Sequence, residues 1–274
     1  MRKGNSYPYT LYRGKYQLLA ADGSSFTFTR NASDPDSYFA PDGKTTNGYN
    51  QVHVIPLFDI LSKRYTDCVV QPIRKKNEFQ ALCTLVDRHN TPPASVPLFI
   101  ADRGFHALNV FAHVIERHGF FLIRATDVKM QRLVGKDLPA DEFPMEEIKN
   151  LYHLRWGIET SFREFKHVIG AMNFHSKKRE YIEMEVWARL LLYNFCSVIT
   201  QHVVINKKGK KHIQQVNYSV AYKACHYFLR QHGGDSPPEV ESLIEKNTLP
   251  IRLDRKYARQ HRFRVPVSFT YRFA

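Results

Sequence analysis

A short segment of the chain, LYHLRWGIETSFREFK, carries four polar side chains that could act together on one ligand. Tyr152, Arg155, Glu159 and Lys166 have the spacing Y-x2-R-x3-E-x6-K. On a helix turning about 100° per residue they fall within a stripe roughly 60° wide, beside an apolar stripe that must pack. A half-sheltered glutamate flanked by cations could bind metal while its neighbours hold phosphate. The alternative is an ordinary amphipathic helix in which Arg155 and Glu159 form an i,i+4 pair of small energetic value.

Two aspartates upstream stand at comparable places in the chain. Asp22 ends the apolar segment LLAAD, and Asp102 ends the apolar segment FIAD. Neighbouring parallel strands bring their carboxyl ends side by side, and ligands bind at that edge of open α/β sheets. With Glu159 from a covering helix, three carboxylates could converge on Mg²⁺ or Mn²⁺, because hard oxygen ligands suit these ions. Two ions about 4 Å apart would activate a water or a 3′-hydroxyl against a phosphodiester.

Each of these acids also has a simpler interpretation, and so do their neighbours. Asp22 precedes glycine and Asp102 precedes Arg-Gly, so both could be turn residues. Arg103 could pair with Asp102 or contact the ligand. We expect Trp156 to be a packing residue. His53 and His106 are expected to be hydrogen-bonded structural histidines and are left out of the site.

The elements that must position the acids alternate along the chain. We expect three strands, a helix, a strand, a helix and a strand before the helix that carries the four polar residues. The second and third strands can form a hairpin, whereas later strands need helical crossovers and should be parallel. An α/β fold with a mixed sheet flanked by helices follows. The predicted strands are YQLLAADGSSFTF with a turn at Asp22-Gly23, NQVHVIPLFDI, RYTDCVVQPI, VPLFIADRGF and FFLIRATD; the predicted helices are EFQALCTLVDRH and HALNVFAHVIERHG; and Thr29 to Asn50 is a predicted loop.

Basic segments flank the predicted core, which spans residues 16–206. Residues 1–15 are basic and aromatic without a period, which predicts an extended arm. Residues 128–150 form a short polar connection, and a long helix begins near Tyr181. The last segment, 207–274, is a basic C-terminal extension with helical structure. It starts with the run KKGKKH, which is either a solvated turn or a phosphate contact.

Composition narrows the classes of protein and partner. The 274 residues are 43% hydrophobic, enough for a substantial core, and 40 Lys and Arg against 26 Asp and Glu give a net charge of +14, which favours a polyanionic partner such as nucleic acid. Four separated cysteines without a C-x2-C pair indicate buried thiols in a reducing cytosol, not a disulfide framework or a zinc site. The uncharged run 190–206 contains Asn194, Gln201 and His202, so it is expected to be a core helix and not a membrane span.

Together these motifs resemble the DDE transposases of the insertion-sequence-four family. The resemblance runs through LLAADGS at Asp22, FIADRGF at Asp102 and LYHLRWGIETSFREFK at Glu159, and it extends loosely over most of residues 16–200. It implies a ribonuclease H-like fold in which Asp22, Asp102 and Glu159 form the metal-binding catalytic triad. The implied reaction is metal-dependent DNA cleavage followed by strand transfer.

The same resemblance assigns the other polar residues and the partners. Tyr152, Arg155 and Lys166 would grip the DNA end near the cleaved phosphate, a role that suits a planar guanidinium and a compact ammonium. The implied partners are double-stranded transposon ends and target DNA, with two Mg²⁺ or Mn²⁺ ions as cofactors. The active form would be a homodimer in the bacterial cytoplasm, with no membrane contact.

Two features depart from the usual pattern of that family. Members generally carry a separate DNA-binding region before the first aspartate, and only 21 residues precede Asp22. Many also insert a β-rich subdomain before the glutamate, for which residues 128–150 are a shortened counterpart. The chain is therefore expected to be either a compact member or a truncated and internally deleted copy. The alternative functions are a catalytically inactive DNA-binding remnant and a ribonuclease H-like nuclease.

Overall fold

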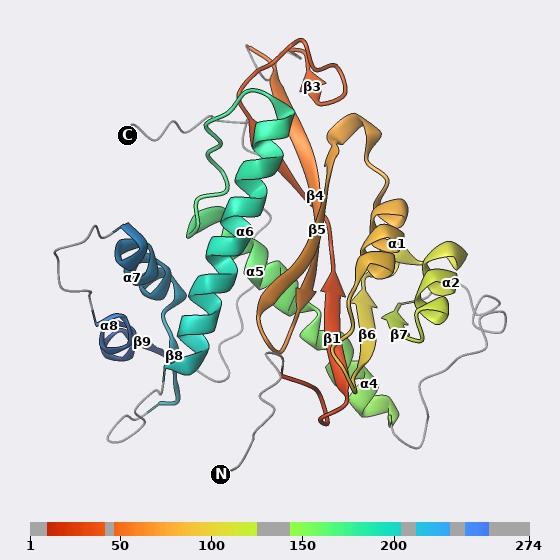
Figure 1. The fold of residues 1–274 in the computed structure, drawn as a ribbon, viewed down its shortest axis with the longest axis vertical. Coiled ribbons are helices and arrows are strands. Elements are labelled where there is room, and N and C mark those ends of the chain that lie inside the picture. The colour runs from red at the N-terminus through yellow and green to blue at the C-terminus, as the bar shows by residue number, and fades with distance from the viewer. Residues whose placement is uncertain (1–9, 42–46, 125–142, 204–211, 231–238, 252–274) are drawn as a thin grey trace. The chain divides into compact units, whose positions relative to one another are not determined.

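The computed structural model divides the chain into two compact units (Figure 1). The first unit comprises residues 1–27, 34–37 and 51–162, and the second comprises 28–33, 38–50 and 163–274. The predicted N-terminal arm, the connection after the last strand, the KKGKKH run and the basic tail lie largely or wholly outside the described residues. The structure describes residues 10–41, 47–124, 143–203, 212–230 and 239–251.

A mixed sheet with β1 (Tyr16–Ala21) at its centre organises the first unit (Figure 1). β1 runs antiparallel to β4 (Tyr49–Asp59) and parallel to β6 (Val96–Ala101), and β7 (Phe120–Ile123) is parallel to β6. β5 (Arg64–Pro72) forms an antiparallel hairpin with β4. All six residues of β1 are buried, as expected for a central strand. The predicted hairpin, the parallel strands and the mixed α/β fold are confirmed.

The strand pairing around Asp22-Gly23 differs from the sequence-based expectation. β2 (Ser24–Phe28) pairs with β4, the strand that β1 also pairs with, so the expected turn does not reverse the chain. β4 has 11 residues and can accommodate both partners in succession. The predicted loop over 29–50 is also partly wrong, because β3 (Tyr38–Phe39) pairs with the first two residues of β4.

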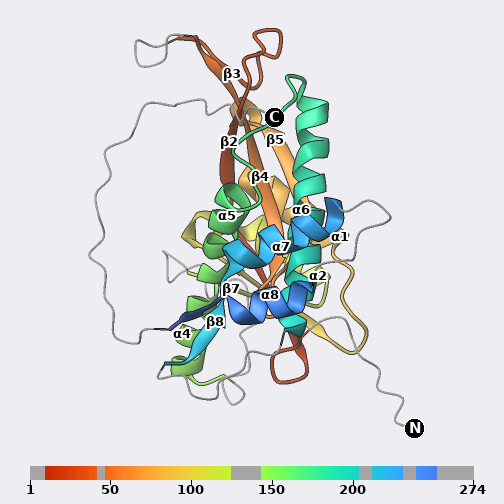
Figure 2. The same cartoon turned by 90° about the vertical axis from the view of Figure 1, so that its left-hand side faces the viewer.

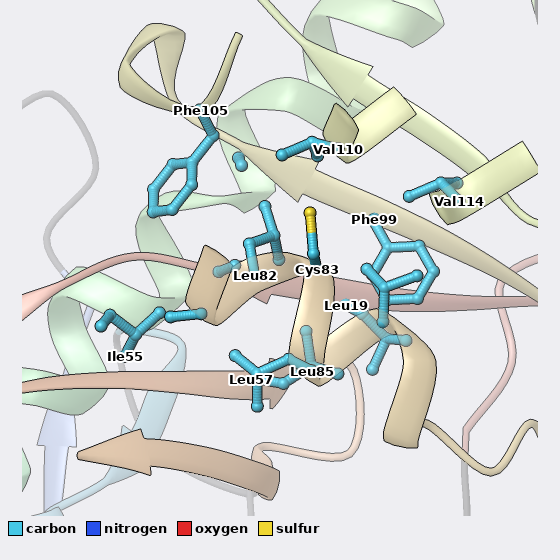
Figure 3. Packing of buried hydrophobic residues seen from close by; sticks show 14 residues of the cluster. Leu19, Ile55, Leu57, Leu82, Cys83, Leu85, Phe99, Phe105, Val110 and Val114 are labelled. Carbon is cyan, nitrogen blue, oxygen red and sulfur yellow. The ribbon is translucent and has the colours of Figure 1, made fainter. Parts of the chain in front are cut away.

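Two helices pack against the sheet and against each other. α1 (Glu78–Arg88) begins at Asn77, whose side-chain oxygen accepts a hydrogen bond from the backbone N–H of Gln80, and α2 (Leu108–Glu116) follows the short 3₁₀ turn Arg103–Phe105. Their apolar faces meet the side chains of β1, β4 and β6 in one buried cluster (Figure 3). This core packs against the strands whose ends carry Asp22 and Asp102. Its members include Leu19, Leu57, Leu82, Leu85, Phe99, Val110 and Val114.

The helix that carries the four polar residues is interrupted, contrary to the single helix expected. α4 (Met145–Leu154) and α5 (Trp156–His167) meet at Arg155. There the N–H of Arg155 donates to the Tyr152 carbonyl, and the N–H of Ile158 donates to the Arg155 carbonyl. Both bonds span three residues instead of four, so the backbone tightens locally into a 3₁₀-like turn.

The first half of α5 is held against the sheet by buried contacts. The Tyr65 hydroxyl of β5 donates to Ser161 Oγ at 2.8 Å, and both groups are buried. Gly157 lies close to the sheet, since a Cβ there would be 3.6 Å from an Ile60 methyl and 3.9 Å from the Phe58 ring. These contacts fix the helix turn that carries Glu159.

The second unit is mainly helical (Figure 2). The predicted long helix is α6 (Arg179–His202), and the helical extension contains α7 (Tyr218–Arg230) and α8 (Val240–Lys246). A small antiparallel pair, β8 (Gln214–Val216) with β9 (Thr248–Pro250), was not expected. Both kinds of element support a packed core for this part of the chain.

Aromatic side chains of α6 and α7 pack together in the second unit. Tyr193 of α6 donates a hydrogen bond from its hydroxyl to Glu164 at 3.0 Å, and its ring lies 5.4 Å from that of Tyr222.

All four cysteines of the chain are buried free thiols, as predicted. Among the described residues, no helix combines the length and the apolar character needed to span a membrane.

Candidate active site

Asp22 and Asp102 lie at the same edge of the central sheet. The parallel register of β1 and β6 pairs Ala21 with Ala101, the last residue of each strand. The next residue in each chain segment is the aspartate, so the two side chains start from neighbouring positions. The sequence-based expectation that these two acids share the carboxyl edge is met.

A close backbone contact determines the local geometry at Asp22. The N–H of Gly23 donates to Asp22 Oδ1 at 2.8 Å. A Cβ at position 23 would lie 2.4 Å from His53 Nε2, so only glycine fits there without a shift. The His53 ring is buried, lies 3.1 Å from Ser25 Oγ and contacts Glu78 at 2.7 Å. These contacts are those of the hydrogen-bonded structural histidine that the sequence predicted.

Asp102 is held by the turn that follows it. Its Oδ1 accepts a hydrogen bond from the N–H of Gly104 at 2.7 Å, and the residue caps the 3₁₀ turn Arg103–Phe105. Arg103 is exposed, and no ion pair joins it to Asp102 among the residues that the structure describes. Asp102 thus combines a turn role with a position at the carboxyl edge of the sheet.

The guanidinium of Arg155 links two of the three acids. Its Nη2 donates to Glu159 Oε1 at 2.9 Å, and its Nη1 lies 3.9 Å from Asp22 Oδ2. The Arg155 side chain is 10% exposed, whereas that of Glu159 is 52% exposed. The guanidinium carbon also lies 5.8 Å from the centre of the Tyr152 ring, within cation–π range. The i,i+4 pair is present, but it belongs to a cluster that also contains Asp22.

Burial and neighbouring charges shift the protonation of Asp22. Burial raises the pKa of Asp22 to about 6, against the lowering effects of the Gly23 hydrogen bond and the Arg155 charge. The negative charges of Asp102 and Glu159 raise this pKa further. Asp102 and Glu159 therefore both act electrostatically on Asp22, and the Arg155 charge offsets part of their effect on its pKa.

The carboxylates of Asp22, Asp102 and Glu159 do not converge on a single point in this structure. Across the described residues, no three His, Cys, Asp or Glu side chains converge closely enough to hold a single ion as they stand. The expectation that these carboxylates lie within a few ångströms of one another is not met. Arg155 stands between Asp22 and Glu159 instead. The donor chemistry still fits Mg²⁺ or Mn²⁺, because carboxylate oxygens gather at one edge and a buried Asp22 among like charges favours a nearby cation.

The remaining residues of the four-residue motif and its surroundings are placed as follows. Tyr152 is partly buried beside Arg155. Lys166 lies near the end of α5, beyond Phe162, and so belongs to the second unit.

Trp156 is 58% exposed, with its ring against His153, so the expected packing role is wrong. A helical-wheel projection of the sequence already indicates that Trp156 is exposed, because this residue falls outside the apolar stripe of the segment.

Comparison with known proteins is consistent with this arrangement. A family model described as "Transposase DDE domain" matches residues 13–195. The chain is 29% identical over 148 residues to the transposase for insertion sequence element IS231E of Bacillus thuringiensis subsp. finitimus, covering 52% of this chain and 30% of that protein. It is 29% identical over 140 residues to transposase InsG for insertion sequence element IS4 of Escherichia coli K12, covering 48% and 31%. The matched region therefore spans less than a third of each of these relatives.

Proposed function

Because the chain belongs to the DDE transposase family, we propose that it is an insertion-sequence transposase that cleaves DNA and joins the cut end to target DNA. The finer assignment is to the insertion-sequence-four group, with its Y-x2-R-x3-E-x6-K motif. One observation carries the proposal: paired strand ends present Asp22 and Asp102 together, and Arg155 connects Asp22 to Glu159. This arrangement supports one acidic site to which three separate parts of the chain contribute.

Asp22, Asp102 and Glu159 would hold two divalent ions, Mg²⁺ or Mn²⁺. Such ions, when bound, would supply an activated water or 3′-hydroxyl and neutralise charge on the phosphodiester. Asp22 must give up its proton to act as a ligand, which its pKa of about 6 allows at neutral pH. Glu159 is half exposed, so its carboxylate can exchange the Arg155 guanidinium for another cation.

Tyr152, Arg155 and Lys166 would contact the DNA end. Arg155 is nearly buried, so a phosphate would have to enter the acidic site itself to reach the guanidinium. A net charge of +14 supports a polyanionic substrate and steers it by long-range attraction. The proposed substrates are double-stranded transposon ends and target DNA. The proposed working form is a homodimer in the bacterial cytoplasm.

The decisive experiment is a cleavage and joining assay on the full chain. Labelled duplexes and pre-cut ends are incubated with Mg²⁺ or Mn²⁺, with EDTA as a blank. We expect Glu159→Gln to lose both reactions, while Glu146→Gln, an exposed acid paired with Lys149 on α4, retains them. Cutting without joining would indicate a nuclease, and binding without cutting would indicate an inactive remnant. Activity that survives Glu159→Gln would refute the catalytic assignment.

Salt dependence of binding tests the DNA contacts separately. Each lost phosphate contact should reduce the slope of log affinity against log salt by about one unit. We expect this for Arg155→Ala and Lys166→Ala on any duplex sequence, because phosphate contacts carry no sequence information. Lys149→Ala, an exposed lysine of α4 paired with Glu146, serves as the matched control. Unchanged slopes in both variants would mean that this side of the helix faces protein.

A further inference from the structure

One face of α6 carries large apolar side chains that remain exposed in the described structure (α6 in Figure 1). Met184 is 64% exposed and Leu191 is 67% exposed, which is unusual for apolar residues in the middle of a long helix. The exposed apolar residues that line this face, here called the α6 seam, are Tyr181, Met184, Ala188, Leu191, Phe195 and Val198.

The opposite face of α6 already serves the core of its own unit. Ile182, Val186, Leu190 and Tyr193 are buried there, and α6 contacts α7 and α8. An ordinary surface helix has one apolar stripe and one polar face. α6 therefore has a second apolar surface that the packing of the second unit does not use.

The spacing of the α6 seam is that of a coiled coil. Its residues advance along the chain in steps of three, four, three, four and three. That alternation keeps apolar side chains on a period of 3.5 residues, which lines a seam between two helices. α6 has 24 residues, so at 1.5 Å per residue the seam lies on a rod about 36 Å long.

We propose that the α6 seam docks against the same seam of a second copy of this chain, with the two helices antiparallel. The proposal deepens the proposed function, because it names the surface that would form the homodimer. At roughly 200 Å² for a whole large side chain, the seam and the adjoining Trp187 expose about 600 Å² of apolar surface. The largest apolar patch of a typical monomer covers about 300–600 Å², so this patch lies at the upper end of that range, and a standard interface buries about 800 Å² per partner.

Charge along α6 favours the antiparallel orientation. The charged residues of α6 all lie in its first half, which contains Arg179, Glu180, Glu183, Glu185 and Arg189, while the stretch from Leu190 to His202 carries no Asp, Glu, Lys or Arg. Parallel helices in register would place each charged residue beside the like residue of the other copy. Antiparallel helices place each charged half beside the uncharged half of the other copy and also oppose the two helix dipoles.

An antiparallel register also matches the side chains by size. In such coiled coils, a residue at one seam position faces the other kind of seam position in the partner helix. One register pairs Ala188 with Leu191 of the second copy, Phe195 with Met184, and Tyr181 with Val198, and the two-fold axis repeats each contact. Every layer then combines a larger side chain with a smaller or more flexible one. Six layers form from six residues, with none left unmatched.

The first test is the oligomeric state of the full chain, measured by sedimentation velocity across a concentration series without DNA or metal. We expect a dimer whose dissociation constant rises at least tenfold in Leu191→Glu. Leu243→Glu, at a 40% exposed leucine of α8, should leave the dimer unchanged. Circular dichroism melts will verify that both variants fold. A monomeric parent at tens of micromolar, or a dimer that tolerates Leu191→Glu, would overturn the proposal.

The second test resolves the orientation of the helices. Leu191→Glu and Ala188→Lys should each be monomeric alone and form a dimer when mixed, because the register brings the two new charges together. A parallel pair would instead be restored by mixing Leu191→Glu with Leu191→Lys, and that result would overturn the antiparallel arrangement. Glu159→Gln should dimerise normally. Failure to dimerise is thus distinguishable from failure to cut DNA.

Discussion

Replacing Asp22 by asparagine should make the folded protein more stable at neutral pH while removing a proposed metal ligand. Burial raises the pKa of Asp22 from 3.8 to about 6 in the folded chain, and the side chain is only 26% exposed. A raised carboxyl pKa means that folding favours the protonated form. The stability that protonated Asp22 contributes to the fold is fully present below pH 3.8 and is lost as the pH rises through 6.

The magnitude follows from the size of that shift. About two pKa units correspond to roughly 3 kcal/mol, which is the upper limit of what ionised Asp22 costs the fold above pH 7. The amide that replaces the carboxylate carries no charge at any pH. We therefore expect Asp22→Asn to raise the free energy of unfolding by up to about 3 kcal/mol at pH 7.5 and by close to nothing at pH 4.

The assay is urea unfolding between pH 4 and pH 8 in buffers that contain EDTA. Glu146→Gln is the matched control, because it removes the same charge at a side chain that is 80% exposed. Burial lowers the pKa of His89 to about 4, so protonation of this residue destabilises the fold as the pH falls. Each variant is therefore compared with the parent protein at the same pH. An Asp22→Asn variant that is no more stable than the parent at pH 7.5, or equally stabilised at pH 4, would refute this reasoning.

Three further predictions concern the surroundings of the site. Gly23→Ala should destabilise the fold by more than about 1 kcal/mol in thermal melts, because its methyl group would collide with His53, whereas Gly157→Ala should be neutral or stabilising, since its nearest contact is 3.6 Å. Tyr65→Phe should lower the free energy of unfolding by about 1 kcal/mol, since it leaves buried Ser161 without its donor; an unchanged value would mean that water replaces the hydroxyl. All four cysteines should resist a thiol reagent until denaturant is added, and rapid labelling of the native protein would contradict their burial.

Local sequence patterns were enough to predict most of the fold. Apolar runs such as VPLFIA and YQLLAA read as buried strands, and the spacing between them separated the hairpin from the parallel crossovers. The pairing of β2 with β4 could not be predicted, because it depends on the length of β4 and not on the turn signal at Asp22-Gly23. The break at Arg155 also escaped prediction, since no proline marks it and Gly157 follows two residues later.

The placement of the candidate site residues was predictable in part. Parallel-strand geometry was sufficient to bring Asp22 and Asp102 to one edge. Helical spacing put Arg155 and Glu159 on one side, but it could not show that the same guanidinium also approaches Asp22. That contact depends on where α5 crosses the sheet, which the Tyr65 to Ser161 hydrogen bond helps to determine. Long-range packing is invisible to a local pattern.

The parallel pairing of β1 with β6 also governs when the acidic site can exist during folding. Asp22 and Asp102 are 80 residues apart in the chain, and Glu159 follows 57 residues later. Closing such long loops costs entropy before the contacts they permit are made, so sheets of this kind form slowly and late. A nascent or partly folded chain therefore holds its three acids far apart. The acidic site that we propose can therefore form only once the sheet is complete.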